Sequence, residues 1–437
     1  MNKVTYKTLR IGDIVQTVSF THKFNKDKLI AINTSDVYDG TMGAGTLTPI
    51  NELKGQFKKT IQKGDILFSE IRPANRRFAK VSISDCQDFV VSTKLMVLRI
   101  FNDKVDANYF FYCLTNQPFL DTLQRRAENR IGSFPQITFD ILAGYTFPIP
   151  PLDEQKRIAK VIFNIDRKIE LNKAINDNLE AMARQLYDYW FVQFDFPNEK
   201  GKPYKSSGGD MVWNEKLKRE IPEGWNVANV FDELSVQYGF PFSTELFTEE
   251  PTSIPVVRIR DILENSVSAY SEEEVDEKYK LQKQDLLVGM DGNFHMNYWN
   301  DNVSYLNQRS VRLRAKSKST VSIMQAKYDI APYIKAKELR AKGSTVGHLS
   351  DKDLKELFVL VCPNIDFRNK FDSILAEIIE NRCEMIELTK QRDELLPLLM
   401  NGQATVNYHL SSTPTTAFGM INKASTGIIG TAKFDMD

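Results

Sequence analysis

The chain has 437 residues, enough for two or three domains with hydrophobic cores, and its 42% hydrophobic and 26% charged residues are ordinary for a folded protein. The 57 Lys and Arg residues balance 57 Asp and Glu residues, so the formal net charge is zero and any nucleic-acid surface has to be local. No run is long and apolar enough for a signal peptide or a membrane span, so we expect a cytoplasmic protein with no membrane partner.

Residues 1–150 are expected to form a first globular domain, and one stretch of it is strongly basic. Between Lys54 and Lys80, eight Lys or Arg residues stand against two acidic ones. The segment Arg72–Arg77 follows an apolar strand and should project as a loop, where arginine can contact guanine edges and asparagine adenine edges. Lysines are better suited to phosphates. The candidate DNA-binding residues of this domain are Lys58, Lys59, Arg72, Asn75, Arg76, Arg77, Lys94 and Ser133.

A long helix is expected within residues 151–195. Pro148-Ile149-Pro150-Pro151 stops an extended segment, and Asp153 and Glu154 follow where negative charge stabilises a helix N-terminus. Apolar residues then recur mostly at steps of three and four, which predicts a helix from about Asp153 to about Phe191. The apolar stripe consists of Ile158, Ile162, Ile165, Ile169, Ile175, Leu179, Met182, Leu186 and Trp190.

The segment after this helix, residues 196–220, is expected to be a linker loop, because Lys200-Gly201-Lys202-Pro203 and Ser206-Ser207-Gly208-Gly209-Asp210 are typical of turns.

Residues 221–363 are expected to form a second globular domain that repeats the first. Four landmarks recur in the same order at a spacing near 210–220 residues, and a long helix follows each set. This pattern indicates an internal duplication and not two unrelated α+β domains. The landmark pairs are Tyr6…Asp13-Ile14-Val15 with Trp225…Asp232-Glu233-Leu234, Lys63–Leu67 with Lys283–Leu287, Ser92–Arg99 with Asn307–Arg314, and Gly132-Ser133…Asp140-Ile141-Leu142 with Gly343-Ser344…Asp353-Leu354.

The second domain has its own basic cluster, from Arg309 to Lys342, with ten basic and two acidic residues. The loop Asp291–Asn297 stands where the first domain has its arginine loop; it is polar and aromatic, so the two loops would read different bases. An ordinary solvated face is the alternative for either cluster, and their presence in corresponding halves favours DNA. The candidate DNA-binding residues here are Asn293, His295, Asn297, Arg309, Lys342 and Ser344.

A second long helix is expected within residues 364–400. Pro363 stops the chain, Asn364 can cap, and the stripe predicts a helix from about Ile365 to about Leu396, which Pro397 should end or kink. Its stripe is Phe371, Ile374, Ile378, Met385, Leu388 and Leu395, with Asn381 and Arg392 at the remaining seam positions.

Stripes of this length require a helical partner, so the two helices should pair as an antiparallel coiled coil. We expect Ile162, Ile165, Leu179 and Met182 to face Ile374, Ile378, Met385 and Leu388, in a register that the pattern leaves open. Residues 401–437 lack periodicity and are expected to be a tail that is mobile or docks loosely. The predicted fold class is α+β.

The sequence carries no pattern for catalysis or metal binding. A P-loop, a glycine-rich dinucleotide fingerprint and the Asn/Asp-Pro-Pro-aromatic segment of amino-methyltransferases are all missing. The triplet Asp276-Glu277-Lys278 lies in an acidic run and is better explained as a solvated loop than as a nuclease motif. We therefore expect no catalytic residue, no metal and no cofactor in this chain. The cysteines, expected to be reduced thiols, and the scattered histidines are Cys86, Cys113, Cys362, Cys383, His22, His295, His348 and His409.

Several local motifs, spread over nearly the whole chain to about residue 405, resemble the specificity subunits of type I restriction–modification systems. They are Gly64–Ser69, Pro150-Pro151-Leu152-Asp153-Glu154-Gln155, Tyr189–Asp195, Ile221-Pro222-Glu223-Gly224-Trp225 and Leu398–Gln403. Two features depart from the family pattern. Gln284 stands where the second Gly-Asp-Ile-Leu-like turn should have glycine, and the tail from about Ala404 has no counterpart.

The resemblance implies that each globular half is a target recognition domain reading one part of a split double-stranded DNA site, with the coiled coil fixing the separation. Methyltransferase subunits, expected to be two, would flank the coil, and motor–nuclease restriction subunits would join for cleavage. S-adenosylmethionine, ATP and Mg²⁺ would belong to those partners.

Two alternatives stay open. The chain could serve a related system that cleaves beside its site with a fused methyltransferase–nuclease. It could also be a scaffold whose two domains bind proteins across a coiled-coil spacer, which would not need the basic clusters.

Overall fold

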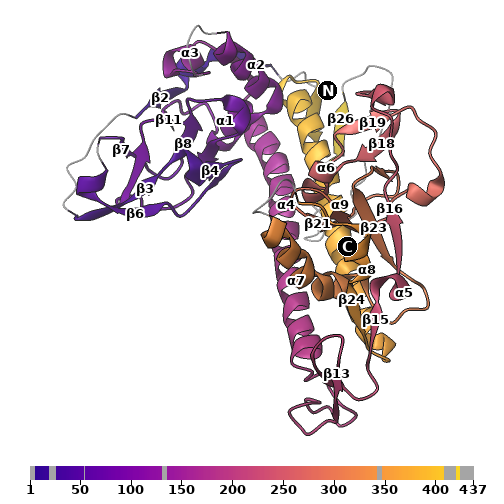
Figure 1. The fold of residues 1–437 in the computed structure, drawn as a ribbon. Helices are drawn as coiled ribbons and strands as arrows, with labels where there is room; N and C mark the ends of the chain where they lie inside the picture. The colour runs from indigo at the N-terminus through magenta and orange to yellow at the C-terminus, as the bar shows by residue number, and fades with distance from the viewer. Residues whose placement is uncertain are drawn as a thin grey trace. The chain divides into compact units, whose positions relative to one another are not determined.

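The computed structural model describes residues 5–18, 26–53, 55–129, 135–341, 347–407 and 420–423, and the chain divides into two compact units (Figure 1). Unit 1 consists of residues 1–167 and 388–437, and unit 2 of residues 168–387. Each unit holds one globular domain and parts of both long helices. Among the described residues, no helix is long and apolar enough to cross a bilayer.

Unit 1 contains two four-stranded sheets and a two-stranded ribbon that ties the start of the domain to its end. The strands of the first sheet pair antiparallel throughout, whereas β3 and β10 of the second pair parallel. The sheets are ordered β2(Val15–Thr17)-β11(Leu95–Ile100)-β8(Ile66–Ser69)-β9(Phe78–Lys80) and β6(Thr46–Pro49)-β3(Lys28–Ile32)-β10(Phe89–Ser92)-β7(Phe57–Thr60); the ribbon is β1(Lys7–Arg10) with β12(Thr146–Ile149), and a short hairpin is β4(Val37–Tyr38) with β5(Thr41–Met42).

The helices of this domain start on side-chain caps. Asp106 accepts hydrogen bonds from the backbone of Asn108 and Tyr109, and Asn116 accepts one from Phe119. These caps begin the helices α1(Ala107–Thr115) and α2(Gln117–Glu128), which a third helix, α3(Phe139–Ala143), follows. Their buried faces share one core with the first sheet and with the beginning of the long helix.

Unit 2 repeats this architecture, which confirms the predicted duplication. Its sheets are ordered β16(Leu234–Tyr238)-β23(Ser310–Ala315)-β20(Leu286–Gly289)-β21(Met296–Tyr298) and β17(Phe247–Thr248)-β19(Ala269–Ser271)-β18(Ile254–Val257)-β22(Tyr305–Leu306), and the closing ribbon is β15(Asn226–Asn229) with β24(Phe358–Val361). Its shorter helices are α5(Val230–Glu233), α6(Ile259–Glu264), α7(Ile323–Ala341) and α8(Asp351–Lys355).

One buried ion pair shows how closely the halves match. Asp65, which is 1% exposed, accepts two hydrogen bonds of 2.8 Å from Arg99. Asp285 is equally buried and accepts two, of 2.6 and 2.7 Å, from Arg314. The turn before Asp285 keeps its geometry without glycine, because Gln284 adopts the left-handed conformation (φ 73°) that Gly64 adopts in the first half (φ 94°).

The two long helices are α4(Leu152–Tyr187), continued by a π-helical turn over residues 188–192, and α9(Ile365–Met400). The prediction that Pro397 ends or kinks the second helix near Leu396 was wrong about its end. The helix runs on to Met400, because Leu396, Leu399 and Met400 are buried in the core of unit 1. This packing outweighs the one backbone hydrogen bond that proline cannot donate.

The helices pair antiparallel, and polar groups take part in the seam. In unit 1, Arg392 donates to Asp166 at 3.0 Å. In unit 2, Asn381 donates to Asn176 at 2.9 Å, and Asn176 donates to the carbonyl of Ile378 at 3.1 Å. The polar residues that interrupt the predicted stripe of the second helix therefore have polar partners on the first.

The predicted seam was wrong at Met182. Its side chain is 48% exposed, whereas neighbouring Ala183 is fully buried in the core of unit 2. Asn176, at 6% exposure, also lies inside, beside the predicted Ile175. The prediction used large apolar residues alone, so it left out Asn176 and Ala183, which are buried in the interface. The predicted seam is therefore one residue off at this point.

Part of the linker and part of the tail are ordered. The hairpin β13(Met211–Asn214) with β14(Arg219–Pro222) lies at the end of the predicted linker. In the tail, β25(Ala404–Asn407) pairs with β26(Met420–Lys423), and Ala404 and Val406 are buried in the core of unit 1. Loose docking therefore does not describe residues 404–407; residues 408–419 and 424–437 lie outside the described residues.

Candidate nucleic-acid interface

The arginine loop of the first domain connects β8 to β9, and the backbone of Ser69 bonds to Arg77 across its base at 2.8 Å. Arg72 and Arg76 both adopt left-handed conformations, with φ of 47° and 53°. Such values are uncommon for residues other than glycine, and they turn the loop sharply at both ends. Arg72 and Asn75 are exposed. Within the described part of the chain, neither side chain makes a hydrogen bond or ion pair, so both are available to a ligand.

The other two arginines of this loop are bound within the domain. Arg76 donates to Asp39 at 2.6 and 3.0 Å and to Gln117 at 2.7 Å. Arg77 reaches the carbonyls of Ser35 and Val37, both at 3.3 Å. These contacts hold the loop in place; the expectation that Arg76 and Arg77 read bases stays a prediction.

Lys59, which we expect to contact phosphate, is bound within the domain in the absence of DNA. Its ammonium donates to the carbonyls of Thr93 (3.1 Å) and Leu95 (2.7 Å), and burial lowers its pKa, although nearby Glu70 raises it. Lys58 and Lys94 are exposed and have no side-chain partner among the described residues. Ser133 lies outside the described residues.

Backbone hydrogen bonds place loop 291–297 where the first domain has its arginine loop, as the sequence predicted. Arg72 N donates to Pro135 O at 3.1 Å, and Gly292 N to Gly347 O at 2.9 Å. Glu70 N donates to Lys94 O in the first domain, and Met290 N to Arg309 O in the second. Lys94 and Arg309 are thereby equivalent positions.

The candidates of the second loop divide in the same way as those of the first. Asn293 is exposed and His295 is half-buried. The amide of Asn297 donates to the carbonyls of Ile262 and Leu263 at 3.2 and 2.9 Å, and its oxygen accepts from Arg382 at 3.1 Å, so its role in DNA binding stays a prediction. Lys342 and Ser344 lie outside the described residues.

Sequence reasoning missed a cluster around Asp291. This carboxylate pairs with Arg309 at 3.0 Å and with Nδ1 of His348 at 2.6 Å. Arg309 and His348 are both largely exposed. Isolated bridges set His348 opposite Asp291 and Gln136 opposite Ile71, so the two residues are equivalent. His348 stands five positions after Gly343 and Gln136 stands four positions after Gly132, so the landmark match hid this equivalence.

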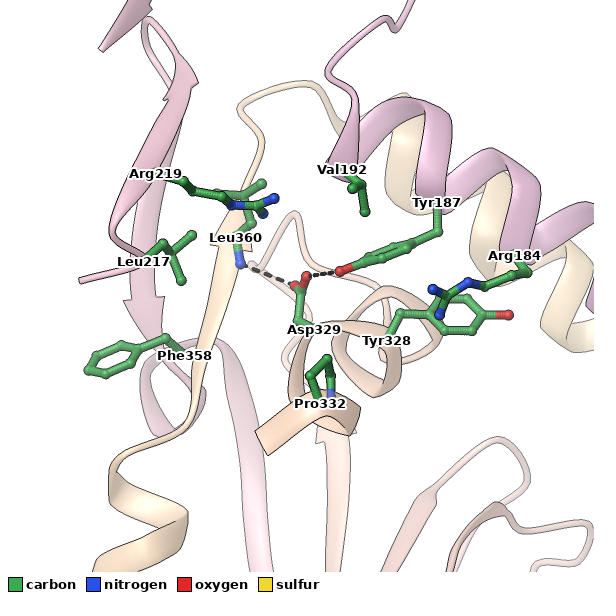
Figure 2. Close-up of a pocket in the computed structure, with 10 residues that line it drawn as sticks. All are labelled: Arg184, Tyr187, Val192, Leu217, Arg219, Tyr328, Asp329, Pro332, Phe358 and Leu360. Atoms are coloured by element: carbon green, nitrogen blue, oxygen red, sulfur yellow. Dashed lines mark hydrogen bonds between the residues drawn. The ribbon is translucent and has the colours of Figure 1, made fainter. Parts of the chain in front are cut away.

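A pocket of about 250 Å³ lies in unit 2, where α4, α7 and β24 meet (Figure 2). Asp329 accepts hydrogen bonds there from the Tyr187 hydroxyl (2.7 Å) and the Leu360 amide (3.1 Å). Burial raises the pKa of Asp329 to about 6, against these hydrogen bonds, which lower it. Arg184 at the rim pairs with Asp188. The bond from Tyr187 to Asp329 ties α4 to the second domain.

The described residues hold no group of three or more His, Cys, Asp or Glu side chains that could bind a metal ion. Each domain has a loop at the equivalent position, held in place by intramolecular contacts. Exposed Arg, Lys, Asn and His side chains lie in or beside these loops. Such side chains can donate to phosphates and to base edges.

Comparison with known proteins gives three matches of note. The family model described as type I restriction modification DNA specificity domain matches residues 3–181 and 222–397. The type I restriction enzyme HindI specificity subunit of Haemophilus influenzae is 39% identical over 191 residues, which cover 44% of this chain and 41% of that protein. The MjaIX specificity subunit of Methanocaldococcus jannaschii is 26% identical over 318 residues, 70% of each chain.

Among solved structures, the type I restriction–modification system S subunit from M. genitalium has a TM-score of 0.52 at 16% identity, and the match covers 92% of this chain and 97% of that one. This likeness concerns the fold alone.

Proposed function

Because the chain belongs to the family of type I restriction modification DNA specificity domains, we propose that it is the specificity subunit of a restriction–modification complex, which reads a two-part DNA site and catalyses no reaction itself. The observation that carries the proposal is the double match: the family model covers both halves, and each half has its own core and its own loop of exposed DNA-compatible side chains. Two such domains in one chain suit a site with two specific parts.

The partners follow from the same membership. Methyltransferase subunits, two per complex, bind alongside the paired helices, and restriction subunits with motor activity join for cleavage. S-adenosylmethionine serves the methyltransferase, and ATP and Mg²⁺ serve the restriction subunits. This chain contributes the contacts that select the site.

Co-expression with the methyltransferase encoded beside it tests the proposal. The complex should co-purify, and mapping of methylated bases in the host DNA should give a motif of two specific parts separated by a fixed number of unspecified bases. The methyltransferase expressed without this chain is the control and should leave that motif unmethylated. Methylation of the same motif without this chain, or a motif with one specific part, would contradict the proposal.

A further inference from the structure

Equivalent backbone hydrogen bonds in the two domains also show that Gln136 and His348 occupy equivalent positions. Gln136 lies beside the arginine loop, and His348 lies beside loop 291–297. Ile137 N donates to Glu70 O at 2.8 Å, and Leu349 N donates to Met290 O at 2.7 Å. An isolated antiparallel bridge sets Gln136 opposite Ile71, and another sets His348 opposite Asp291. The two residues therefore occupy the same place relative to their recognition loops.

A carboxylate from the recognition loop holds each of these side chains. Gln136 Nε2 donates to Glu70 at 2.7 Å. His348 Nδ1 lies 2.6 Å from Asp291, which is itself only 18% exposed, whereas the His348 side chain is 59% exposed. A ring nitrogen held in this way fixes the orientation of the imidazole and leaves Nε2 for an external partner.

We propose that Gln136 and His348 are equivalent base-reading residues, one in each recognition domain, and that each accepts a hydrogen bond from an exocyclic amino group of adenine or cytosine in the major groove. This inference rests on the proposed function. Glu70 and Asp291 each engage a nitrogen of these side chains, which leaves an acceptor atom of each for DNA, and an acceptor can bond to a base amino group but not to a phosphate oxygen.

The donor and acceptor pattern selects the amino group. A neutral His348 ring whose Nδ1–H donates to Asp291 has a free lone pair on Nε2. A Gln136 amide whose N–H donates to Glu70 has its oxygen free to accept. Each side chain thus offers an acceptor, and Gln136 keeps a second N–H beside its oxygen. In the major groove the matching donors are N6 of adenine and N4 of cytosine.

The test compares methylation motifs of complexes that carry His348→Ala or Gln136→Ala. His348→Ala should relax one base position in one part of the motif, and Gln136→Ala should relax one position in the other part. The preference for the native base at that position should fall about 2- to 13-fold, since a single hydrogen bond is worth ~0.5–1.5 kcal/mol. Glu249→Ala, at an exposed residue of unit 2 outside both basic clusters, is the control and should leave the motif unchanged.

A second measurement uses binding of synthetic DNA in which the relaxed base is replaced by an analogue without its amino group. The native complex should lose affinity for the analogue, and the alanine variant should bind both DNAs equally. The same experiment with His348→Gln, which retains an acceptor, should keep part of the native preference.

The outcomes separate the two claims. A native complex with a two-part motif whose assembled variants keep the motif unchanged would overturn the inference and leave the proposed function standing. Relaxation in the same part of the motif for both variants would also overturn it. A native complex that methylates no two-part motif would overturn the proposed function and this inference together.

Discussion

Arg72 and Arg76 belong to the same short loop and differ in what their guanidinium groups contact. Arg76 is fixed by Asp39 and Gln117, whereas Arg72 is exposed and has no partner among the described residues. The contacts with Asp39 and Gln117 hold the Arg76 guanidinium in place and use three of its five N–H donors. We propose that Arg72 and Asn75 contact DNA and that Arg76 shapes the loop that presents them.

Arg72→Ala and Lys58→Ala should weaken DNA binding in different ways. Loss of a base-reading arginine should cost ~1–3 kcal/mol and relax one base position. Loss of Lys58 should weaken binding to all sequences and lower the slope of log K against log salt by about one. Titration of site and non-site DNA at several salt concentrations measures both effects. Arg76→Ala removes the contacts with Asp39 and Gln117 and should lower the thermal stability of the domain. Unchanged affinity for Arg72→Ala, Asn75→Ala and Lys58→Ala alike would remove this loop from the interface.

Asp329 should make the stability of unit 2 depend on pH. Its pKa in the folded protein, about 6, is above its ordinary value of 3.8, so the folded state holds this proton more tightly than the unfolded chain. Between pH ~4 and ~6 its contribution to the unfolding free energy should fall as pH rises, by on the order of 3 kcal/mol in total, and stay constant above that window.

Thermal unfolding of the native protein and Asp329→Asn, side by side across this window, measures the effect. Since the variant cannot titrate there, the stability of the native protein relative to it should decline from pH ~4 to ~6. Asp177→Asn, an exposed carboxylate on α4, is the control. A difference that stays constant with pH would contradict the assignment.

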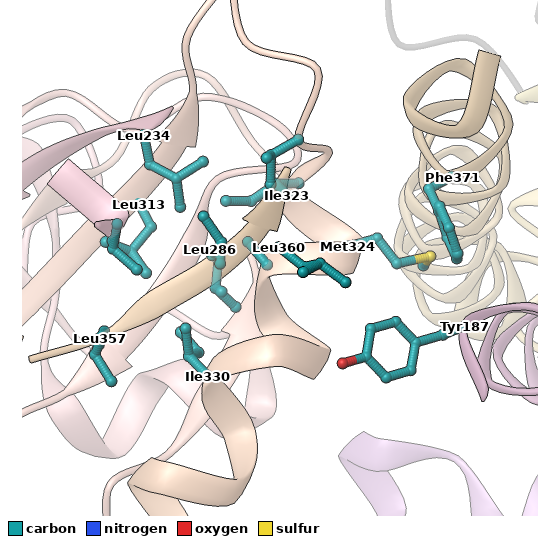
Figure 3. Close-up of a cluster of buried hydrophobic side chains, with 14 of the residues drawn as sticks. Tyr187, Leu234, Leu286, Leu313, Ile323, Met324, Ile330, Leu357, Leu360 and Phe371 are labelled. Atoms are coloured by element: carbon teal, nitrogen blue, oxygen red, sulfur yellow. The ribbon is translucent and has the colours of Figure 1, made fainter. Parts of the chain in front are cut away.

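At the scale of elements, the helix pair combines an apolar seam with buried polar contacts, and the core of unit 2 continues into it. Figure 3 shows Met324 of α7 between the domain core and the side chains of Tyr187 and Phe371 from the two long helices. Domain and helices therefore share one core. Within the pair, Asn381 donates to Asn176, and Asn176 donates to the carbonyl of Ile378, an arrangement that favours one register because a shifted pairing would leave the buried Asn176 without these partners.

Replacing both asparagines with leucine should differ from replacing either one. Asn176→Leu alone leaves the Asn381 amide against apolar groups and should lower stability by ~1–3 kcal/mol. The double variant should recover much of this loss, which gives a coupling energy of ~0.5–3 kcal/mol in a double-mutant cycle of urea unfolding. Additive effects of the two substitutions would show that the pair does not act as a unit.

At the scale of the whole molecule, the length of the helices should set the spacing of the two recognised sequences. Each long helix has 36 residues, a rod of ~54 Å. Insertion of one heptad into each keeps the stripe continuous and lengthens the pair by ~10 Å, about three base pairs of DNA. The variant should prefer a longer spacer with both half-sequences unchanged. A methylation map with the original spacer, from a folded protein carrying both insertions, would refute the ruler model.

The two domains should also act independently in recognition. Exchange of residues 1–150 for those of a relative should change one half of the motif and leave the other intact, because each domain has its own sheets and closing ribbon. Methylation mapping of the chimaera measures this. A change in both halves at once would show that the domains do not read separately.

The sequence by itself determined the duplication, the α+β class, both long helices and the position of the two loops, because these follow from local patterns: the period of apolar residues, proline stops and repeated landmarks. Only the tertiary structure decided which charged residues are available. Arg76, Lys59 and Asn297 look like ligand-binding residues in the sequence, yet their donors are taken by Asp39, Thr93 and Ile262, residues that lie 34 to 37 positions away in the chain.

The tertiary structure also revealed Asp291 and His348, which come together across 57 positions, and the pairing of Asn176 with Asn381 across 205. It likewise showed that Met182 faces outward and that the second helix passes Pro397. In each case the deciding interaction is a contact between distant segments. A hydrophobic pattern records that a residue needs burial, but the partner of a polar group is set by where the fold brings the rest of the chain.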